Sequence, residues 1–185
     1  MLMGVNNSTL LVIDIQEKLL PALFNKAVLA TRAQWLIGAA TELGLPVVFT
    51  EQYPKGLGHT LPQLLEKAPL SQVVDKVSFS CVAGQRLPGT AMERSQFIVM
   101  GVETHICVLQ TVLELLECDK DVFIVTDVMG SRREHDHAIG LERMRDEGAK
   151  LVTREMVVFE MLRQAGTDLF KLISKRYLVD DTPPR

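Results

Sequence analysis

The chain has 185 residues, of which 47% are hydrophobic and 23% are charged, and its formal net charge is −3. This length suits one α/β domain, so we expect a single domain over residues 1–185. The charge lacks the basic excess typical of nucleic-acid-binding proteins, and no apolar run approaches the ~20 residues that a bilayer-spanning helix needs. We therefore expect no nucleic-acid partner and no membrane partner. The first residues lack the pattern of a secretory signal, which predicts a cytoplasmic protein.

Short apolar runs rich in β-branched residues alternate with longer helical stretches along the chain. The runs are continuously apolar, as expected for parallel strands that helices cover on both faces. Glycine follows two predicted helices, at Gly44 and Gly148, where it lets the chain leave the helix and enter the next strand. This repeated step favours βαβ construction. In chain order, the predicted strands span 9–14, 46–50, 72–76, 96–101, 121–127 and 149–153.

Helical stretches are predicted over 19–43, 105–118 and 134–147, and a terminal segment follows over 155–178. The stretch over 105–118 is apolar around most of its circumference, which predicts a helix that is buried on more than one side. Its second apolar side would face another subunit or lie beneath the terminal segment. The sequence leaves both alternatives open.

Reactive side chains end several of the predicted strands. In an open parallel sheet, ligands bind beyond the carboxyl ends of the strands, where the strand order reverses. Asp14 ends the first strand, Lys76 ends the third, and Cys107 lies in the first turn of the helix after the fourth. Each residue has an ordinary structural explanation as a helix cap, a surface lysine or a packed cysteine. Together they would bring a carboxylate, an ammonium and a thiol to one edge of one sheet.

These three groups suit acyl-transfer hydrolysis without a cofactor. A free thiol has a pKa of about 8.5 and is mostly protonated at neutral pH. Lys76 and the helix N-terminus would stabilise a thiolate at Cys107, and Asp14 would accept the proton. Backbone N–H groups of the turn over 102–107 would then hold the oxyanion that forms when sulfur attacks a carbonyl. The other cysteines, Cys81 and Cys118, are expected to be small buried residues.

Several segments resemble the isochorismatase-like hydrolase superfamily. They read LLVIDIQEKL, PVVFTEQYPKGLGHT, DKVSFS, GVETHICVLQT and VTDVMGSR, and they occur in this order between residues 10 and 132. Within the superfamily, the chain is most similar to stand-alone isochorismatase domain-containing proteins. The resemblance implies a three-layer α/β/α sandwich around a six-stranded parallel sheet with Rossmann-like topology. It also implies a homo-oligomer, either a dimer or a tetramer.

The resemblance implies roles for the matching positions. Asp14 would be the base, Lys76 the cation beside it and Cys107 the nucleophile. The amide N–H groups of Glu103 and Cys107 would form the oxyanion hole, next to a cis peptide bond between Val102 and Glu103. The expected function is therefore hydrolysis of a small amide, carbamoyl or related carbonyl compound.

Two departures from related families narrow the expected chemistry. Metal-binding nicotinamidases carry an Asp-x-His pair where this chain has Gln52-Tyr53-Pro54, and His59 alone does not make a divalent site. We therefore expect no metal and no cofactor. True isochorismatases lack a cysteine at the nucleophile position, so Cys107 argues against their enol-ether cleavage. With these two chemistries set aside, the sequence resembles the metal-free cysteine amidases.

Loops after the strand ends supply candidates for the wall of a substrate pocket. Residues 51–70 and 80–95 are rich in proline and glycine, which is typical of loops. Tyr53, Leu57 and Phe79 would line a pocket for a small molecule or pack beneath a loop.

Other polar residues near the nucleophile have alternative roles. His105 would be a general base or would turn toward a subunit interface. Asp127 is expected to end the fifth strand and to bond to backbone N–H groups of the turn that reaches Ser131. Arg132 and Arg133 would bind an anionic substrate, face solvent or form a salt bridge between subunits.

Two other functions remain open at this point. A binding or regulatory protein would retain the fold without significant turnover, and an unactivated Cys107 would favour it over an enzyme. A flavodoxin-like nucleotide binder would share the parallel sheet. However, the first βα turn reads DIQEKL and lacks a glycine-rich phosphate loop.

Overall fold

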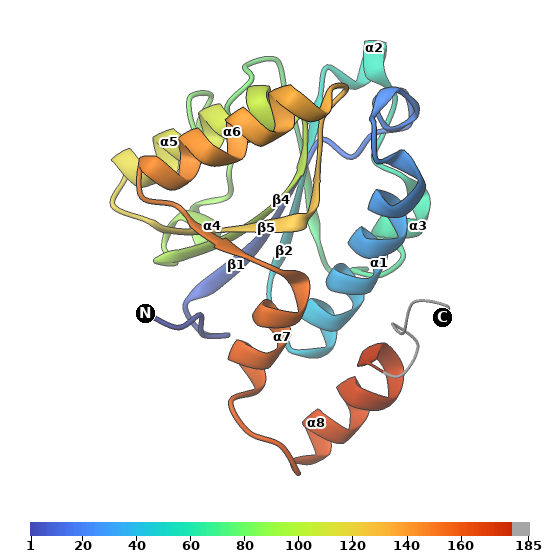
Figure 1. The fold of residues 1–185 in the computed structure, drawn as a ribbon, viewed down its shortest axis with the longest axis vertical. Helices are drawn as coiled ribbons and strands as arrows, with labels where there is room; N and C mark the ends of the chain where they lie inside the picture. The colour runs from blue at the N-terminus through green and yellow to red at the C-terminus, as the bar shows by residue number, and fades with distance from the viewer. Residues whose placement is uncertain (179–185) are drawn as a thin grey trace.

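The computed structural model describes residues 1–178, so residues 179–185 of the expected domain lie outside the described part. One six-stranded, all-parallel sheet of order β3-β2-β1-β4-β5-β6 forms its centre. Helices cover both faces of this sheet (Figure 1), which confirms the predicted three-layer α/β/α fold. The strands are β1 (Ser8–Ile13), β2 (Val47–Gln52), β3 (Gln72–Lys76), β4 (Gln96–Val102), β5 (Asp121–Gly130) and β6 (Lys150–Val152).

The helices fill the connections between the strands and the region after β6. None of the helices in residues 1–178 is long and apolar enough to cross a membrane. They are α1 (Lys26–Glu42), α2 (Pro54–Leu57), α3 (Pro62–Leu65), α4 (Gly89–Met92), α5 (Leu109–Glu117), α6 (Glu134–Asp146), α7 (Arg154–Leu162) and α8 (Asp168–Ile173).

Alternate side chains of β1 face opposite layers, because successive residues of a strand point to opposite faces of the sheet. Leu10 and Val12 belong to the hydrophobic cluster that includes α1 and α7. Leu11 and Ile13 belong to the cluster that includes α5 and α6. All four side chains are buried, which explains why the strand is continuously apolar.

Helix α5 and the terminal segment lie on opposite faces of the sheet (Figure 1). Val112 and Leu115 of α5 pack in the cluster that contains Met144 of α6. Val158 of α7 and Ile173 of α8 pack in the other cluster. The prediction that α5 lies beneath the terminal segment is therefore wrong, and its subunit-interface alternative stays a prediction.

The first predicted helix begins later than its apolar pattern indicates. A short 3₁₀ turn occupies Leu20–Ala22, and α1 starts only at Lys26. Between them Leu23 is extended, with φ −77° and ψ 146°, so a continuous helix cannot pass through it. The side-chain amide of Asn25 donates to the carbonyl oxygen of Met129 at 2.7 Å, which ties this segment to the end of β5.

The second predicted helix opens with an irregular turn. Residues Thr104–Val108 form a π-helical turn, and the regular helix α5 follows it. Turns of this kind occur often at functional sites. The fifth strand also differs from the prediction, because β5 continues past Asp127 to Gly130 after its register with β4 shifts.

The strand order reverses between β1 and β4, which makes this boundary the topological switch point of the sheet. Gly101 lets the two strands approach closely near their carboxyl ends. Its φ is +137°, and a Cβ atom there would lie 2.1 Å from the carbonyl oxygen of Ile13. Asp14 and Glu103 follow the two strands at this boundary. The fold therefore places the predicted site where open α/β sheets bind ligands.

Candidate active site

Asp14 and Lys76 form a buried ion pair at the carboxyl edge of the sheet. Lys76 Nζ lies 2.7 Å from Asp14 Oδ2, and both side chains are 0% exposed. Thr50 Oγ1 donates a hydrogen bond to the other carboxylate oxygen of Asp14 at 2.6 Å. The backbone of Asp14 is left-handed, with φ 53°, a conformation that is uncommon outside glycine and clusters at functional sites.

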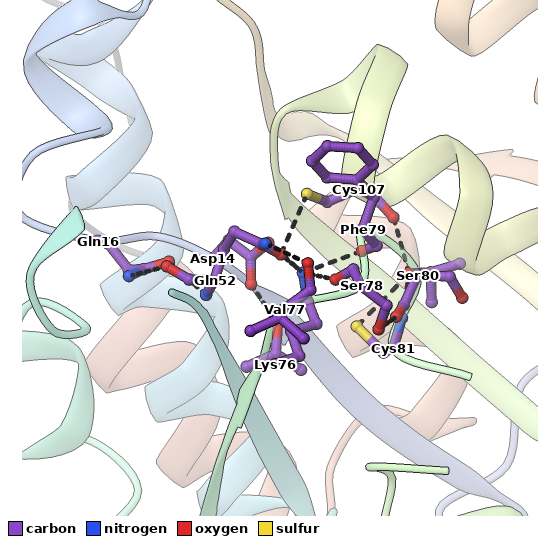
Figure 2. A network of polar contacts seen from close by, with 12 residues as sticks. Asp14, Gln16, Gln52, Lys76, Val77, Ser78, Phe79, Ser80, Cys81 and Cys107 are labelled. Atoms are coloured by element: carbon purple, nitrogen blue, oxygen red, sulfur yellow. Dashed lines mark hydrogen bonds and ion pairs between the residues drawn. The ribbon is translucent and has the colours of Figure 1, made fainter. Parts of the chain in front are cut away.

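Lys76 reaches Asp14 from the end of β3, two strands away in the sheet. Its ammonium also donates to Gln52 Oε1 at 2.6 Å and to the carbonyl oxygen of Phe79 at 2.9 Å (Figure 2). A buried ammonium needs such partners, because an unpaired charge in the protein interior is strongly unfavourable. The alternative of a surface lysine is therefore wrong.

Cys107 lies in the π-helical turn and is 6% exposed. Its Sγ atom lies 4.0 Å from Gln52 Oε1. Burial raises the pKa of the Cys107 thiol, the nearby Asp14 carboxylate raises it further, and Lys76 lowers it only in part. The raised pKa favours a neutral thiol at rest, because burial and Asp14 outweigh the expected stabilisation of a thiolate by Lys76. The role of Cys107 as nucleophile stays a prediction. Asp14 lies close enough to influence the pKa of this thiol, so it is placed to accept the proton when sulfur attacks.

Gln52 is a site residue that the sequence reasoning did not single out as functional. It ends β2 and pairs in register with Lys76 of β3. Its backbone exchanges two hydrogen bonds with the side chain of Gln16, at 2.8 and 3.0 Å. Its side-chain Nε2 donates to the carbonyl oxygen of Val77 at 2.9 Å. Its position at a strand end beside Lys76 was the signal that could have identified it.

A second buried thiol, that of Cys81, lies beside the cluster. Thr111 Oγ1 lies 3.4 Å from Cys81 Sγ and 2.7 Å from the carbonyl oxygen of Cys107. Burial raises the pKa of Cys81 to about 11. Cys118 is exposed, so the prediction that it is buried is wrong.

Glu103 joins the π-helical turn Thr104–Val108 to the segment that follows β5. The peptide bond between Val102 and Glu103 is cis. Arg132 Nε lies 2.6 Å from Glu103 Oε1, and the Arg132 backbone N–H donates to Oε2 at 3.4 Å. Arg132 thus belongs to an ion pair within the chain.

The His105 ring lies on the side of the π-helical turn that faces Glu103 and α6, where both of its nitrogens have polar neighbours. Its Nδ1 atom lies 3.1 Å from Ser131 Oγ and 3.6 Å from Glu103 Oε2. Its Nε2 atom lies 3.9 Å from Asp136 Oδ2. With both ring nitrogens directed at these partners, His105 supports the turn, and the geometry favours Asp14 over His105 as the base for Cys107.

Asp127 has a structural role, although with a different partner from the one predicted. Its Oδ1 atom accepts a hydrogen bond from the backbone N–H of Arg154 at 2.9 Å. The carboxylate therefore fixes the start of α7, and the prediction that it bonds to the turn at Ser131 is wrong.

The predicted pocket residues flank this cluster. Tyr53 is 55% exposed and Phe79 is 52% exposed, whereas Leu57 is half-buried in α2. The backbone N–H of Tyr53 donates to the carbonyl oxygen of Lys76 at 2.9 Å. The exposed rings of Tyr53 and Phe79 are thus carried by backbone that contacts the site, and their role in substrate binding stays a prediction.

Within residues 1–178, no group of three or more His, Cys, Asp and Glu side chains is placed to hold a metal ion. His59 Nδ1 lies 2.9 Å from Glu51 Oε2, and the His59 side chain is exposed. Burial by itself raises the pKa of Glu51, but bonds from Thr60 and His59 outweigh it and lower that pKa overall. This pair therefore orders the loop after β2.

Comparison with known proteins gives a consistent family assignment. The model of the isochorismatase domain matches residues 8–156. Isochorismatase family protein 1B of Dictyostelium discoideum is 35% identical over 172 residues, which cover 90% of this chain and 84% of that protein. The secreted isochorismatase effector Isc1 of Phytophthora sojae is 35% identical over 176 residues, which cover 92% of this chain and 84% of that protein.

A solved structure, described as MAR1 ribonuclease from Caenorhabditis elegans, is also similar. It has a TM-score of 0.91 and 34% sequence identity, over 99% of this chain and 95% of that chain. A six-stranded parallel sheet between two helical layers, with polar side chains gathered at its switch point, defines an open-sheet α/β protein. The chain belongs to the isochorismatase family, which confirms the resemblance seen in its motifs. Membership in this family supports a hydrolase.

Proposed function

We propose that the protein hydrolyses a small amide, carbamoyl or related carbonyl compound, with Cys107 as nucleophile and without a metal. The observation that carries the proposal is the position of the Cys107 thiol beside the buried Asp14–Lys76 pair. A nucleophile next to a base that a third group orients is the recurring arrangement of covalent catalysis.

The first half of the reaction forms a thioester. Asp14 takes the thiol proton as Cys107 Sγ attacks the carbonyl carbon, and a tetrahedral intermediate results. The amide N–H groups of Glu103 and Cys107 bind its oxyanion. Asp14 then gives the proton to the leaving nitrogen, the C–N bond breaks, and an amine or ammonia departs.

The second half releases the acid product. Asp14 takes a proton from a water molecule, whose oxygen attacks the thioester carbon. The C–S bond breaks, the carboxylic acid leaves, and the proton returns to sulfur. Lys76 stays protonated throughout and balances the charge of Asp14, to which it donates at 2.7 Å.

A substrate screen on paired variants tests this proposal. Small amides, carbamoyl compounds and esters are incubated with wild type, Cys107→Ala and the control Cys81→Ala, and the acid product is quantified. We expect Cys107→Ala to lose at least about 1000-fold in kcat/KM, whereas Cys81→Ala keeps most of its activity. Mass spectrometry of rapidly quenched wild type should show an acyl group on Cys107. Undiminished turnover by Cys107→Ala would refute the mechanism.

RNA is a second candidate substrate, because the similar C. elegans structure is described as a ribonuclease. Attack on a phosphodiester by a ribose hydroxyl or water would use Asp14 as base and Lys76 as cation, without the sulfur of Cys107. A net charge of −3 gives little general attraction to phosphates. RNA cleavage that survives Cys107→Ala and is lost in Asp14→Asn would favour this candidate, and the absence of both activities would favour a binding protein.

The proposal also includes a cytoplasmic location and a homo-oligomer. Cys81, Cys107 and Cys118 are free cysteines, which suits a reducing compartment. The similar P. sojae protein is named as secreted, so cell fractionation decides the location. Light scattering of the purified protein measures the mass of the assembly and decides between monomer, dimer and tetramer.

A further inference from the structure

Gln52 presents an oxygen acceptor at the nucleophile. We infer that this oxygen selects substrates whose scissile carbonyl carries an N–H group, by accepting a hydrogen bond from that group. The inference rests on the proposed function and deepens it, because it distinguishes amides and carbamoyl compounds with N–H donors from esters and fully substituted amides. The evidence for it is the set of hydrogen bonds that fixes the orientation of the Gln52 side chain.

The orientation of the Gln52 amide is set from both of its ends. Lys76 Nζ can only donate, so the atom 2.6 Å from it must be the oxygen Oε1. The carbonyl oxygen of Val77 can only accept, so the atom 2.9 Å from it must be Nε2. The two hydrogen bonds between the Gln52 backbone and the Gln16 side chain hold the residue in place (Figure 2).

The oxygen so oriented is within reach of a reacting substrate. A carbonyl oxygen accepts along two lone-pair directions, and Lys76 uses one of them at Gln52 Oε1. At rest the Cys107 S–H donates to the same oxygen at 4.0 Å, and this acceptor position is vacated once Asp14 has taken the thiol proton. An attacked carbon approaches sulfur to about 3–3.5 Å, so a nitrogen that is bonded to that carbon and turned toward Gln52 comes within hydrogen-bonding distance of Oε1.

This hydrogen bond distinguishes substrates by whether their leaving group carries an N–H. The N–H of an amide or carbamoyl group can donate to Oε1, whereas the oxygen of an ester and the nitrogen of an N,N-dialkyl amide cannot. An ester would also place its own lone pairs against the lone pairs of Gln52. Sites that hydrogen-bond a substrate N–H discriminate against analogues that lack it.

The contact also assists the proton transfer that breaks the C–N bond. When one N–H of the leaving group points at Gln52, the nitrogen lone pair of the tetrahedral intermediate is free to face Asp14. Asp14 then gives this nitrogen the proton that it took from Cys107, and the electrons of the C–N bond leave with the amine. No other reactant is required.

The inference is tested with matched substrates and variants of Gln52. The substrates are the N-methyl amide, the N,N-dimethyl amide and the methyl ester of the one acid that wild type releases fastest from its amide. We expect wild type to prefer the N-methyl amide over the N,N-dimethyl amide by about 10-fold or more in kcat/KM. Gln52→Met, which removes the acceptor, should lower this preference and the amide-to-ester ratio by about 10-fold. Gln52→Glu keeps an acceptor and should retain both ratios within about 3-fold.

The outcomes separate this inference from the proposed function. If Gln52→Met slows all three substrates equally, Gln52 only positions Lys76 and the inference is refuted, while the acyl enzyme on Cys107 still forms. A wild type that does not distinguish the two amides refutes it as well, even if Gln52→Met fails to fold. If wild type forms no acyl enzyme and releases no acid from any amide or ester, the proposed function fails, and the inference fails with it.

Discussion

Lys76 Nζ and Asp14 Oδ2 lie 2.7 Å apart with no exposed surface on either side chain. The two charges therefore depend on each other and on a few fixed polar partners, since neither side chain is exposed to bulk solvent in the resting protein. Removing one partner leaves the other charge unpaired in the protein interior. This lowers the free energy of unfolding far more than breaking an ion pair that is exposed to solvent.

The first prediction concerns this ion pair. We expect Asp14→Asn and Lys76→Met each to lower the free energy of unfolding by about 3 kcal/mol and to abolish turnover. The double variant should lose less than the sum, because neither charge is then left unpaired. Urea denaturation of the four proteins measures the coupling, and strictly additive losses would contradict a dependent pair.

The second prediction concerns the resting state of the nucleophile. Burial, and then the Asp14 carboxylate, raise the pKa of Cys107 above that of a free thiol. A raised pKa means less thiolate at every pH below it, so alkylation of Cys107 should still be accelerating at pH 9. At pH 8 the exposed Cys118 should react at least about 10-fold faster. The measurement is iodoacetamide labelling with mass spectrometry.

Its control is Cys118→Ser, which removes the competing exposed thiol. A rate at Cys107 that levels off below pH 8 would mean that the thiolate is preformed. Slow alkylation does not by itself argue against an enzyme, because the proton leaves only when a substrate is attacked.

The third prediction concerns the ion pair of Glu103 and Arg132, which joins the nucleophile turn to the end of β5. We expect Glu103→Gln and Arg132→Met each to lower kcat by about 10-fold with little change in KM, because the turn loses its alignment. The double variant should be no slower than either single variant. Steady-state kinetics of the three variants measure kcat and KM. If the loss in kcat of the double variant equals the product of the two single losses, Glu103 and Arg132 act independently and not as a pair.

The fourth prediction concerns the switch point. Gly101→Ala would place a Cβ atom 2.1 Å from the carbonyl oxygen of Ile13, which is backbone and cannot move aside. We expect a loss of about 4 kcal/mol or more in the free energy of unfolding, or no folded protein. Gly44 is the matched control, since it has φ +80° but nothing within 4 Å of an added Cβ. Gly44→Ala should lose only about 1 kcal/mol, as measured by thermal or urea unfolding. Equal losses would contradict the role assigned to Gly101.

The sequence predicted the centre of the sheet well because the central strands β1 and β4 are buried on both faces. Such strands read as continuous apolar runs, and β1 ends at an abrupt change to polar residues at Asp14. The edge strand β3, which ends at Lys76, is largely exposed and was predicted from its short β-branched run. The βαβ connections make the strands parallel, so their carboxyl ends lie at one edge of the sheet, and the meeting of these side chains at that edge was also predictable.

The remaining features depend on contacts between distant segments. The apolar pattern from residue 19 onward continues through Leu23, and only the extended backbone of this residue and the bond from Asn25 to Met129 show where α1 begins. The neutral state of Cys107 depends on how deeply the π-helical turn is buried. Gln52 looked like a lost metal ligand, and its role became visible only through its distances to Lys76 and Cys107.

The buried pair has a further consequence for how a substrate arrives. Asp14 and Lys76 carry opposite charges, Cys107 is neutral at its raised pKa, and Glu103 is matched by Arg132, so these five residues together carry no net charge to attract or repel an ion. Electrostatic steering therefore contributes little to the encounter rate. For an uncharged amide, kcat/KM should stay nearly constant while added salt shortens the Debye length from about 30 Å to about 8 Å. We therefore expect neutral molecules to reach the site by diffusion without electrostatic steering, and to bind there through shape complementarity.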